Sequence, residues 1–491
     1  MQKSKSINII GAGVSGLVAA CYLSQAGFDV NVFEKNNSIG GRARVFEAQG
    51  FKFDMGPSWY WLPDVFEKTF ADFNKEVKDF YLLNKLDPSY RAFFGDRTVD
   101  VPYGLERFYQ LADELEKGSS HKLKNFFKEA ELKYKIAVDE ICTEPGLSPL
   151  EFVKLKYLKA FLSCDSLSSM RKHILTYISN DYLRQILEFP ILFLGTEANS
   201  TWSLYSFMNH ADSALGTWFP VGGIHQVPKA FMALAEELGV KIHINSPVDE
   251  LKINDKQITL TVNNQKNNCD LVLASCDYHH FEQKILPEEL RNYRSKNYWD
   301  EKVFSPAVLA IYLGLNKKLK NIVHHNIFFD HDYDLNAADI YENHRWPEKP
   351  FIYLSAPSKT DTSLAPDDSE NIFISMPIAT HLEDNDEIRK KYFDYLISRL
   401  EKIIGENIKE NIVFSRIYCI KDFEQDYNSF GGNAFGLANT PLQTHFLRPS
   451  IKNKNDSRIY YCGHNTVPGP GLPTAILSGK LVAKQIIKEH A

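Results

Sequence analysis

Three glycines near the start of the chain limit what it can fold into. Gly11, Gly13 and Gly16 have G-x-G-x-x-G spacing, and they follow an apolar run at Ile7–Ile10 that is typical of a buried strand. In such a turn the first glycine permits a tight bend, the second lets a pyrophosphate approach the backbone, and the third lets the next helix pack on the strand. The pattern predicts a βαβ unit that binds a dinucleotide.

The second strand predicted for this unit ends in an acidic residue. A helix that begins near Val14 would offer the free N–H groups of its first turn, that of Ser15 included, to a diphosphate. Glu34 follows the first glycine by roughly 20 residues and suits a free ribose hydroxyl better than a 2′-phosphate. Lys35 comes directly after it. We place these polar residues in the cofactor site with the three glycines.

Two more glycine-containing loops follow. The first holds Gly40, Gly41 and Arg42, and the second holds Gly56, Pro57 and Ser58. Adjacent glycines expose backbone N–H groups to an anion, and an arginine adds a fork of paired donors. With these loops the chain resembles the superfamily of FAD-dependent amine oxidases, phytoene desaturases and protoporphyrinogen oxidases. The resemblance implies that the first loop lies along the diphosphate and flavin of FAD, and we place the second loop in the same site.

Composition and charge narrow the possible kinds of protein further. The chain has 491 residues, of which 44% are apolar and 24% charged, as in a globular protein of two or three domains. A net charge of −6 argues against a nucleic-acid partner. The cysteines form no C-x-x-C pair and have no metal-ligand spacing. We therefore expect a protein of the reducing cytoplasm without a metal site. The apolar stretch after Lys5 is explained by the first strand, so we expect no export signal, and no run of about 18 apolar residues predicts a membrane span.

The order of the predicted elements indicates an α/β fold in which one domain is interrupted twice. We expect a Rossmann-like FAD-binding domain built from residues 1–100, a return segment at 216–290 and a closing segment at 431–491. Residues 101–215 are mainly helical and are expected to contact substrate or membrane. Residues 291–430 are expected to form a substrate domain with a mixed antiparallel sheet.

Periodic patterns place the main elements of the later segments. We predict helices at residues 228–238 and 386–405, and strands at 241–245, 248–253, 258–262, 271–275, 308–313, 351–354 and 372–376. Val248 follows Pro247 at the start of one of these strands. The resemblance implies that the backbone of Val248 contacts the adenine of FAD.

The closing segment carries the most specific signature. A strand at 459–462 enters a Gly/Pro-rich turn, and an apolar helix begins near Pro473. Its positive end would favour negative charge on a reduced flavin. The spacing of Gly, Thr and Pro residues from Gly463 to Pro473 resembles the closing signature of bacterial and fungal carotenoid desaturases, which implies cofactor contacts for Gly463, Leu472 and Pro473. Many members have a histidine where this chain has Val467, so we assign no catalytic base there and treat His464 as a packing or backbone-bonding residue.

Several segments of the substrate side allow two interpretations. The aromatic run at 59–62 either lines a bulky apolar pocket or packs in the core. Residues 152–162 form an amphipathic, lysine-bearing pattern that suits either a membrane interface or a surface helix. Asp165, Glu197 and His225 are candidates for a proton acceptor only because they lie in these segments. The catalytic residue is therefore left unassigned.

The resemblance implies an FAD-dependent carotenoid desaturase, in which hydride leaves an allylic C–H for flavin and a proton leaves the adjacent carbon. The substrate is a lipophilic carotenoid of the phytoene type or a later one, and the alternative is 3,4-desaturation of a hydroxylated or monocyclic carotenoid. An amine oxidase, a carotenoid isomerase and a non-catalytic prenyl-protein binder are further alternatives. No second G-x-G-x-x-G unit is present, so oxygen or a quinone is expected to accept the electrons. We expect a cytoplasmic protein that associates peripherally with the cytoplasmic membrane.

Overall fold

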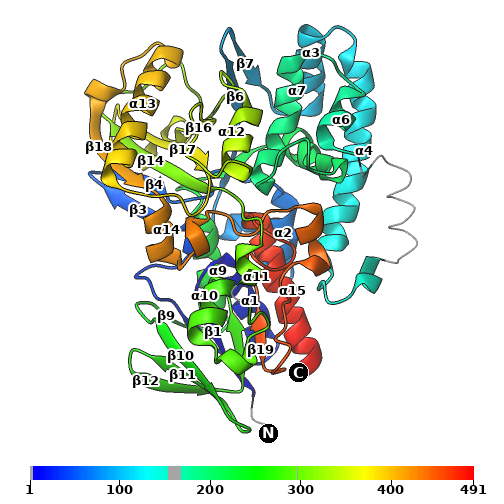
Figure 1. Cartoon of the computed structure of the whole chain (residues 1–491), viewed down its shortest axis with the longest axis vertical. Coiled ribbons are helices and arrows are strands. Elements are labelled where there is room, and N and C mark those ends of the chain that lie inside the picture. Colours follow the sequence, from blue (N-terminus) through cyan, green and yellow to red (C-terminus); the bar gives the residue numbers. More distant parts are fainter. Residues whose placement is uncertain (1–3, 153–165, 167, 296) are drawn as a thin grey trace.

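A parallel β-sheet of five strands lies in the lower half of the molecule in Figure 1. The computed structural model describes residues 4–152, 166, 168–295 and 297–491. The strand order is β19-β13-β1-β2-β9, with bounds Ser6–Ile10 (β1), Asp29–Phe33 (β2), Lys241–His243 (β9), Leu271–Ala274 (β13) and Ile459–Tyr461 (β19). Every pairing in this sheet is parallel. Three distant parts of the chain thus form one sheet, which confirms the predicted Rossmann-like fold.

Three helices pack beside this sheet. Helix α1 (Val14–Gln25) contacts both α9 (Gln226–Glu237) and α15 (Leu472–His490). The side chains of α1 are buried on all its faces up to Leu23, which explains its uniformly apolar sequence. A Cβ atom at Gly479 of α15 would lie 2.3 Å from the carbonyl oxygen of Ser15. The closing segment therefore packs directly on the first helix of the βαβ unit.

A small antiparallel sheet extends from the return segment. Its strands are β10 (Val248–Ile253), β11 (Ile258–Val262) and β12 (Gln265–Cys269). The sequence analysis does not predict β12, because its residues are mostly polar and show no apolar alternation. The turn before it specifies the strand instead: Asn263 and Asn264 both have positive φ, as a two-residue hairpin turn requires.

A sheet of seven strands lies in the upper half of the molecule (Figure 1). Its order is β18-β14-β17-β16-β15-β6-β7, with bounds Tyr90–Phe94 (β6), Arg97–Val101 (β7), Ala307–Leu315 (β14), His325–Phe328 (β15), Ile352–Ser355 (β16), Glu370–Ile378 (β17) and Ile412–Tyr418 (β18). All pairings are antiparallel, as predicted, except that of β15 with β6, which is parallel. Strands β6 and β7 come from near residue 100, so the early chain contributes to both large sheets.

Helices flank the seven-stranded sheet. Helix α13 (Asp386–Ile404) packs its buried Leu396 and Leu400 on the sheet and ends at Gly405 in the left-handed region, as predicted. On the other side Figure 1 shows a group of helices, and their bounds are Leu105–Leu115 (α3), Ser119–Asp139 (α4), Met170–Leu175 (α6) and Asp181–Glu188 (α7). The amphipathic pattern at 152–162 lies outside the described residues, apart from its first residue.

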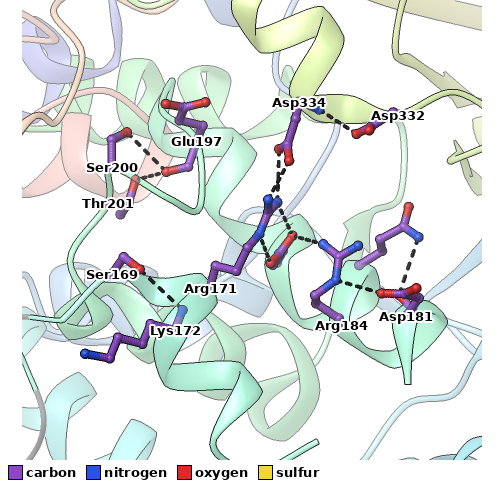
Figure 2. A network of polar contacts seen from close by, with 12 residues as sticks. Ser169, Arg171, Lys172, Asp181, Arg184, Glu197, Ser200, Thr201, Asp332 and Asp334 are labelled. Atoms are coloured by element: carbon purple, nitrogen blue, oxygen red, sulfur yellow. Dashed lines mark hydrogen bonds and ion pairs between the residues drawn. The ribbon is translucent and has the colours of Figure 1, made fainter. Parts of the chain in front are cut away.

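A charged network joins the helical group to the seven-stranded sheet (Figure 2). Arg171 of α6 donates through Nε and Nη2 to both carboxylate oxygens of Glu188 of α7, at 2.7 and 2.8 Å. Its Nη2 also donates to Asp334 at 3.0 Å, and Asp334 lies on α12 (Tyr333–Tyr341), between β15 and β16. Arg184 adds a second cation to Glu188 at 2.9 Å. The network ties α6 and α7 to α12, which lies between β15 and β16 in the chain.

Replacing Arg171 tests this contact. We expect Arg171→Met to lower the free energy of unfolding by about 3 kcal/mol, because it leaves the buried carboxylate of Glu188 short of a partner. Thermal unfolding measures the change. The matched control is Lys135→Met, which loses only an exposed pair with Glu131 and should cost less than about 0.5 kcal/mol. Equal losses of unfolding free energy in the two variants would contradict a stabilising role for the network around Arg171.

Candidate functional site

A cavity of about 1120 Å³ is lined by both large sheets. Ile10 of β1 and Phe33 of β2 line one end of it, and Val308 of β14 and Phe373 of β17 line another part. Pockets for one small ligand usually measure ~300–1,000 Å³, so this cavity is large enough for a nucleotide cofactor together with a second molecule.

The residues predicted to bind the cofactor gather at this cavity. Those that line it are Gly11, Gly13, Ser15, Glu34, Lys35, Gly40, Gly41, Arg42, Gly56, Pro57, Ser58, Val248, Gly463, Leu472 and Pro473. Gly16 does not line it. A Cβ atom on Gly16 would lie 2.4 Å from the carbonyl oxygen of Gly11 and 2.8 Å from Ser275 Oγ, so this glycine serves the packing of α1 on the strands.

The two glycine loops pack backbone against backbone. The N–H of Gly40 donates to the carbonyl of Ala12 at 2.8 Å, and Gly40 forms an isolated bridge with Gly13. A Cβ atom on Gly41 would lie 3.3 Å from the Cα of Gly13. Gly40 and Gly41 both have positive φ, which side chains disfavour. Glycine is therefore required both by the close approach and by the backbone conformation.

Glu34 is held in place at the carboxyl end of β2. It is buried, and its two carboxylate oxygens accept N–H groups of Ala12 and Asn36, each at 2.9 Å. The remaining lone pairs can accept ribose hydroxyls. Lys35 lines the cavity, but its ammonium group reaches Asn428 at 3.4 Å.

The polar groups near the glycine loops and Glu34 fit FAD. Arg42 is partly buried and its Nε has no hydrogen-bond partner among the described residues. The amino-terminal ends of α1 and α15 both border the cavity, through Val14 and Leu472, and they supply positive potential. A partly buried arginine, two helix ends and bare glycine backbones match a diphosphate and a flavin that gains negative charge on reduction.

The other end of the cavity is an apolar chamber. Trp59, Trp61 and Leu62 line it, whereas Tyr60 points away and bonds the hydroxyl of Tyr81 at 3.0 Å. The aromatic run therefore both lines a pocket and packs in the core. Further apolar side chains from α4 and the turn after it, from residues 202–208 and from β14 and β17 complete the wall, and they include Ala137, Val138, Ile141, Leu204, Phe207, Met208, Val308, Ala310 and Phe373.

A hydrogen-bonded group that includes Tyr353 of β16 is one of the places where polar atoms interrupt the apolar wall. Tyr353 of β16 donates its hydroxyl to Ser58 Oγ at 2.8 Å, and its oxygen lies 2.7 Å from Nδ1 of His325. Ser58 and Tyr353 both line the cavity, whereas His325 is fully buried and stacks on Trp59 at 3.9 Å between ring centroids. Burial lowers the pKa of His325 well below its usual value, so this ring is neutral and a poor proton acceptor.

The candidates for a proton acceptor do not reach the chamber. Nδ1 of His225 lies 2.7 Å from the carbonyl of Ala43, and this ring fixes the loop that holds Arg42. Glu197 borders the charged network of Figure 2, where burial and nearby carboxylates raise its pKa. Neither residue lines the cavity, and Asp165 lies outside the described residues. No catalytic base is assigned from this set.

His464 differs from its expected role. Its side chain lines the cavity, its Nδ1 lies 3.2 Å from Nη1 of Arg42, and its Nε2 lies 3.6 Å from Oδ2 of Asp277. From the sequence we expect His464 to be a packing or backbone-bonding residue, and no pattern there points to Asp277 or Tyr353. These partners are hundreds of positions apart in the chain, and no spacing pattern connects them.

Comparison with known proteins defines the class. The model for flavin containing amine oxidoreductases matches residues 14–487, and the chain belongs to this family as one of its carotenoid desaturase-like members. A carotenoid 3,4-desaturase from Haloarcula japonica is 36% identical over 490 residues, covering 99% of both chains. A 4,4'-diapophytoene desaturase from Staphylococcus haemolyticus is 30% identical, covering 98% of this chain and 99% of the relative.

A solved structure supports the fold independently. An oxidoreductase from Methanosarcina mazei superposes with a TM-score of 0.65 at 16% identity, covering 98% of this chain and all of the other. Family and fold together make the protein an FAD-dependent oxidoreductase, in agreement with the cofactor predicted from the glycine loops.

Two glycine substitutions separate cofactor binding from folding. A Cβ atom at Gly13 meets no protein atom within 4 Å, so Gly13→Ala should leave the midpoint of thermal unfolding of the cofactor-free protein unchanged. Because Gly13 lines the cavity, the methyl group should weaken FAD binding at least tenfold, which is about 1.4 kcal/mol. Gly16→Ala, whose Cβ would collide with Gly11, should lower the unfolding midpoint itself. Unchanged FAD affinity in Gly13→Ala, measured by quenching of flavin fluorescence, would contradict the assignment.

Proposed function

We propose that the protein desaturates a carotenoid. The observation that supports this function best is the apolar, aromatic chamber that continues directly from the nucleotide loops. Bound FAD supplies hydride acceptance from a saturated carbon, with loss of a proton from the neighbouring carbon. The side chains supply what a hydrocarbon needs, which is a close apolar fit that holds the chain in place and excludes water.

The preferred reaction within this class is 3,4-desaturation. The relative from Haloarcula japonica carries that name and matches the whole chain. Ser58 and Tyr353 favour a substrate with one oxygen, because Ser58 Oγ accepts from Tyr353 and can donate its own proton to a substrate oxygen in the cavity. A substrate hydroxyl buried without a hydrogen bond would cost about 1–3 kcal/mol. We therefore infer that the substrate is a hydroxylated carotenoid whose oxygen binds beside Ser58.

The direct test compares substrates and one tyrosine variant. The FAD-loaded protein, with lipid vesicles, is incubated separately with phytoene, lycopene and a 1-hydroxylated carotenoid, and the absorption of the extracted pigment is recorded. A red shift is expected with the hydroxylated substrate. Tyr353→Phe should lower kcat/KM for it about tenfold and leave any turnover of lycopene unchanged. The matched control is Tyr205→Phe, which removes another cavity hydroxyl that bonds Thr444 at 3.3 Å.

The outcomes separate the alternatives. Conversion of phytoene alone would favour an early desaturase, for which the diapophytoene desaturase relatives are the model. No shift with any carotenoid, in protein that binds FAD, would contradict desaturation and favour an amine oxidase or an isomerase. Protein that fails to bind FAD would favour a non-catalytic binder of prenyl groups.

We also propose peripheral association with the cytoplasmic membrane, where a carotenoid and a quinone acceptor dissolve. Support comes from leucines on two adjacent segments that contribute to the cavity lining, at residues 141–152 and 441–447. Leu150 and Leu442 are 75% and 80% exposed, and Leu147 and Leu447 are partly exposed. Gly146 lies close to the backbone of Phe446, so the segments are neighbours. Within the described ranges, no helix is long and apolar enough to cross a bilayer.

A charge introduced among these four leucines, which we call the leucine rim, should weaken membrane binding. Leu442→Asp and Leu150→Asp should each reduce co-sedimentation with phospholipid vesicles several-fold, because a carboxylate resists transfer into lipid. Turnover of carotenoid delivered in vesicles should fall in parallel, while FAD affinity stays the same. Leu335→Asp is the matched control, since Leu335 is 54% exposed on α12. Equal binding by rim and control variants would contradict this membrane surface.

A further inference from the structure

A row of three polar side chains crosses the flavin end of the cavity. Arg42 comes from the short turn Gly41–Ala43, His464 follows β19, and Asp277 caps α10 (Tyr278–His280) by accepting the N–H of His280 at 3.0 Å. All three side chains line the cavity. His464 lies between the other two, with Nδ1 at 3.2 Å from Arg42 Nη1 and Nε2 at 3.6 Å from Asp277 Oδ2.

The contact with arginine fixes the protons of the imidazole ring. A guanidinium group can only donate hydrogen bonds, so Nδ1 of His464 must accept and its proton must reside on Nε2. The N–H of Nε2 then points toward the carboxylate of Asp277. Burial and the charge of Arg42 lower the pKa of His464 to about 4, in agreement with a neutral ring. The row therefore consists of a cation (Arg42), a neutral ring (His464) and an anion (Asp277).

Without the spacer, the two charges would be expected to pair directly. Arginine and carboxylate side chains in a poorly solvated site form bidentate contacts at about 2.7–2.9 Å. Here Arg42 instead bonds His464 and Ser429, each at 3.2 Å, and its Nε has no hydrogen-bond partner among the described residues. The positive charge of Arg42 thus remains available to a group in the cavity.

We propose that His464 is a positioning residue that keeps Arg42 apart from Asp277, so that the charge of Arg42 acts on the flavin. A cation beside the flavin stabilises the reduced form, which carries more negative charge, relative to the oxidised form. The inference rests on FAD as the cofactor of this cavity. It concerns the reduction potential of the bound flavin and holds whichever carotenoid is the substrate.

The test measures the midpoint potential of bound FAD by redox titration, with no carotenoid present. His464→Ala allows direct pairing of Arg42 with Asp277. It should reduce the stability of reduced relative to oxidised flavin about tenfold, which is about 30 mV for two electrons. His464→Gln should restore the wild-type potential, because its amide can accept from Arg42 through Oε1 and donate to Asp277 through Nε2.

A double-variant cycle distinguishes spacing from general disturbance of the site. Asp277→Asn keeps an oxygen to cap α10 but removes the charge. In the His464→Ala background it should therefore restore the potential, by raising the stability of reduced relative to oxidised flavin about tenfold. In protein that retains His464, Asp277→Asn should change the potential much less. Equal shifts in both backgrounds would overturn the proposal, and so would an unchanged potential in His464→Ala or a lowered one in His464→Gln. Failure to desaturate any carotenoid would leave these potentials unaffected, so the two proposals fail separately.

Discussion

The structure depends on the close approach of two glycine loops at the carboxyl ends of the parallel strands. Gly13 and Gly40 bridge backbone to backbone, and neither Gly40 nor Gly41 can carry a side chain without strain. This contact brings bare N–H groups and the end of α1 to one surface. The closing segment packs α15 on α1 through another glycine, Gly479, and adds a second helix end. A diphosphate site follows from these contacts before any side chain is considered.

The substrate side follows a different physical rule. A saturated carbon chain offers no hydrogen bonds, so recognition must come from shape, from dispersion and from the exclusion of water. The seven-stranded sheet and the helical group supply the apolar wall, and the charged network around Arg171 ties the helical group to α12, between β15 and β16. Against that wall, the hydroxyls of Ser58 and Tyr353 are the feature that can distinguish an oxygenated substrate from a hydrocarbon.

Much of this arrangement could be predicted from the sequence, because local rules specify it. Glycine spacing predicted the βαβ unit, and the apolar stripe with a terminal glycine predicted α13. Polar strands such as β12 were missed because only pairing and a turn define them. Contacts between distant residues were missed as well. The bond of His464 to Arg42 spans 422 positions, and a lone histidine in a Gly/Pro-rich turn carries no signal of its partner.

An anaerobic single turnover tests whether the flavin takes its hydride from the carotenoid. The FAD-loaded protein in vesicles is mixed without oxygen with one equivalent of a hydroxylated carotenoid, and the visible spectrum is followed. We predict that oxidised flavin absorbance disappears at the same rate as a polyene with one more conjugated double bond appears, and that admitting an acceptor restores the oxidised flavin. A longer polyene that forms while the flavin stays oxidised, or flavin reduction without a change in the polyene, would contradict it.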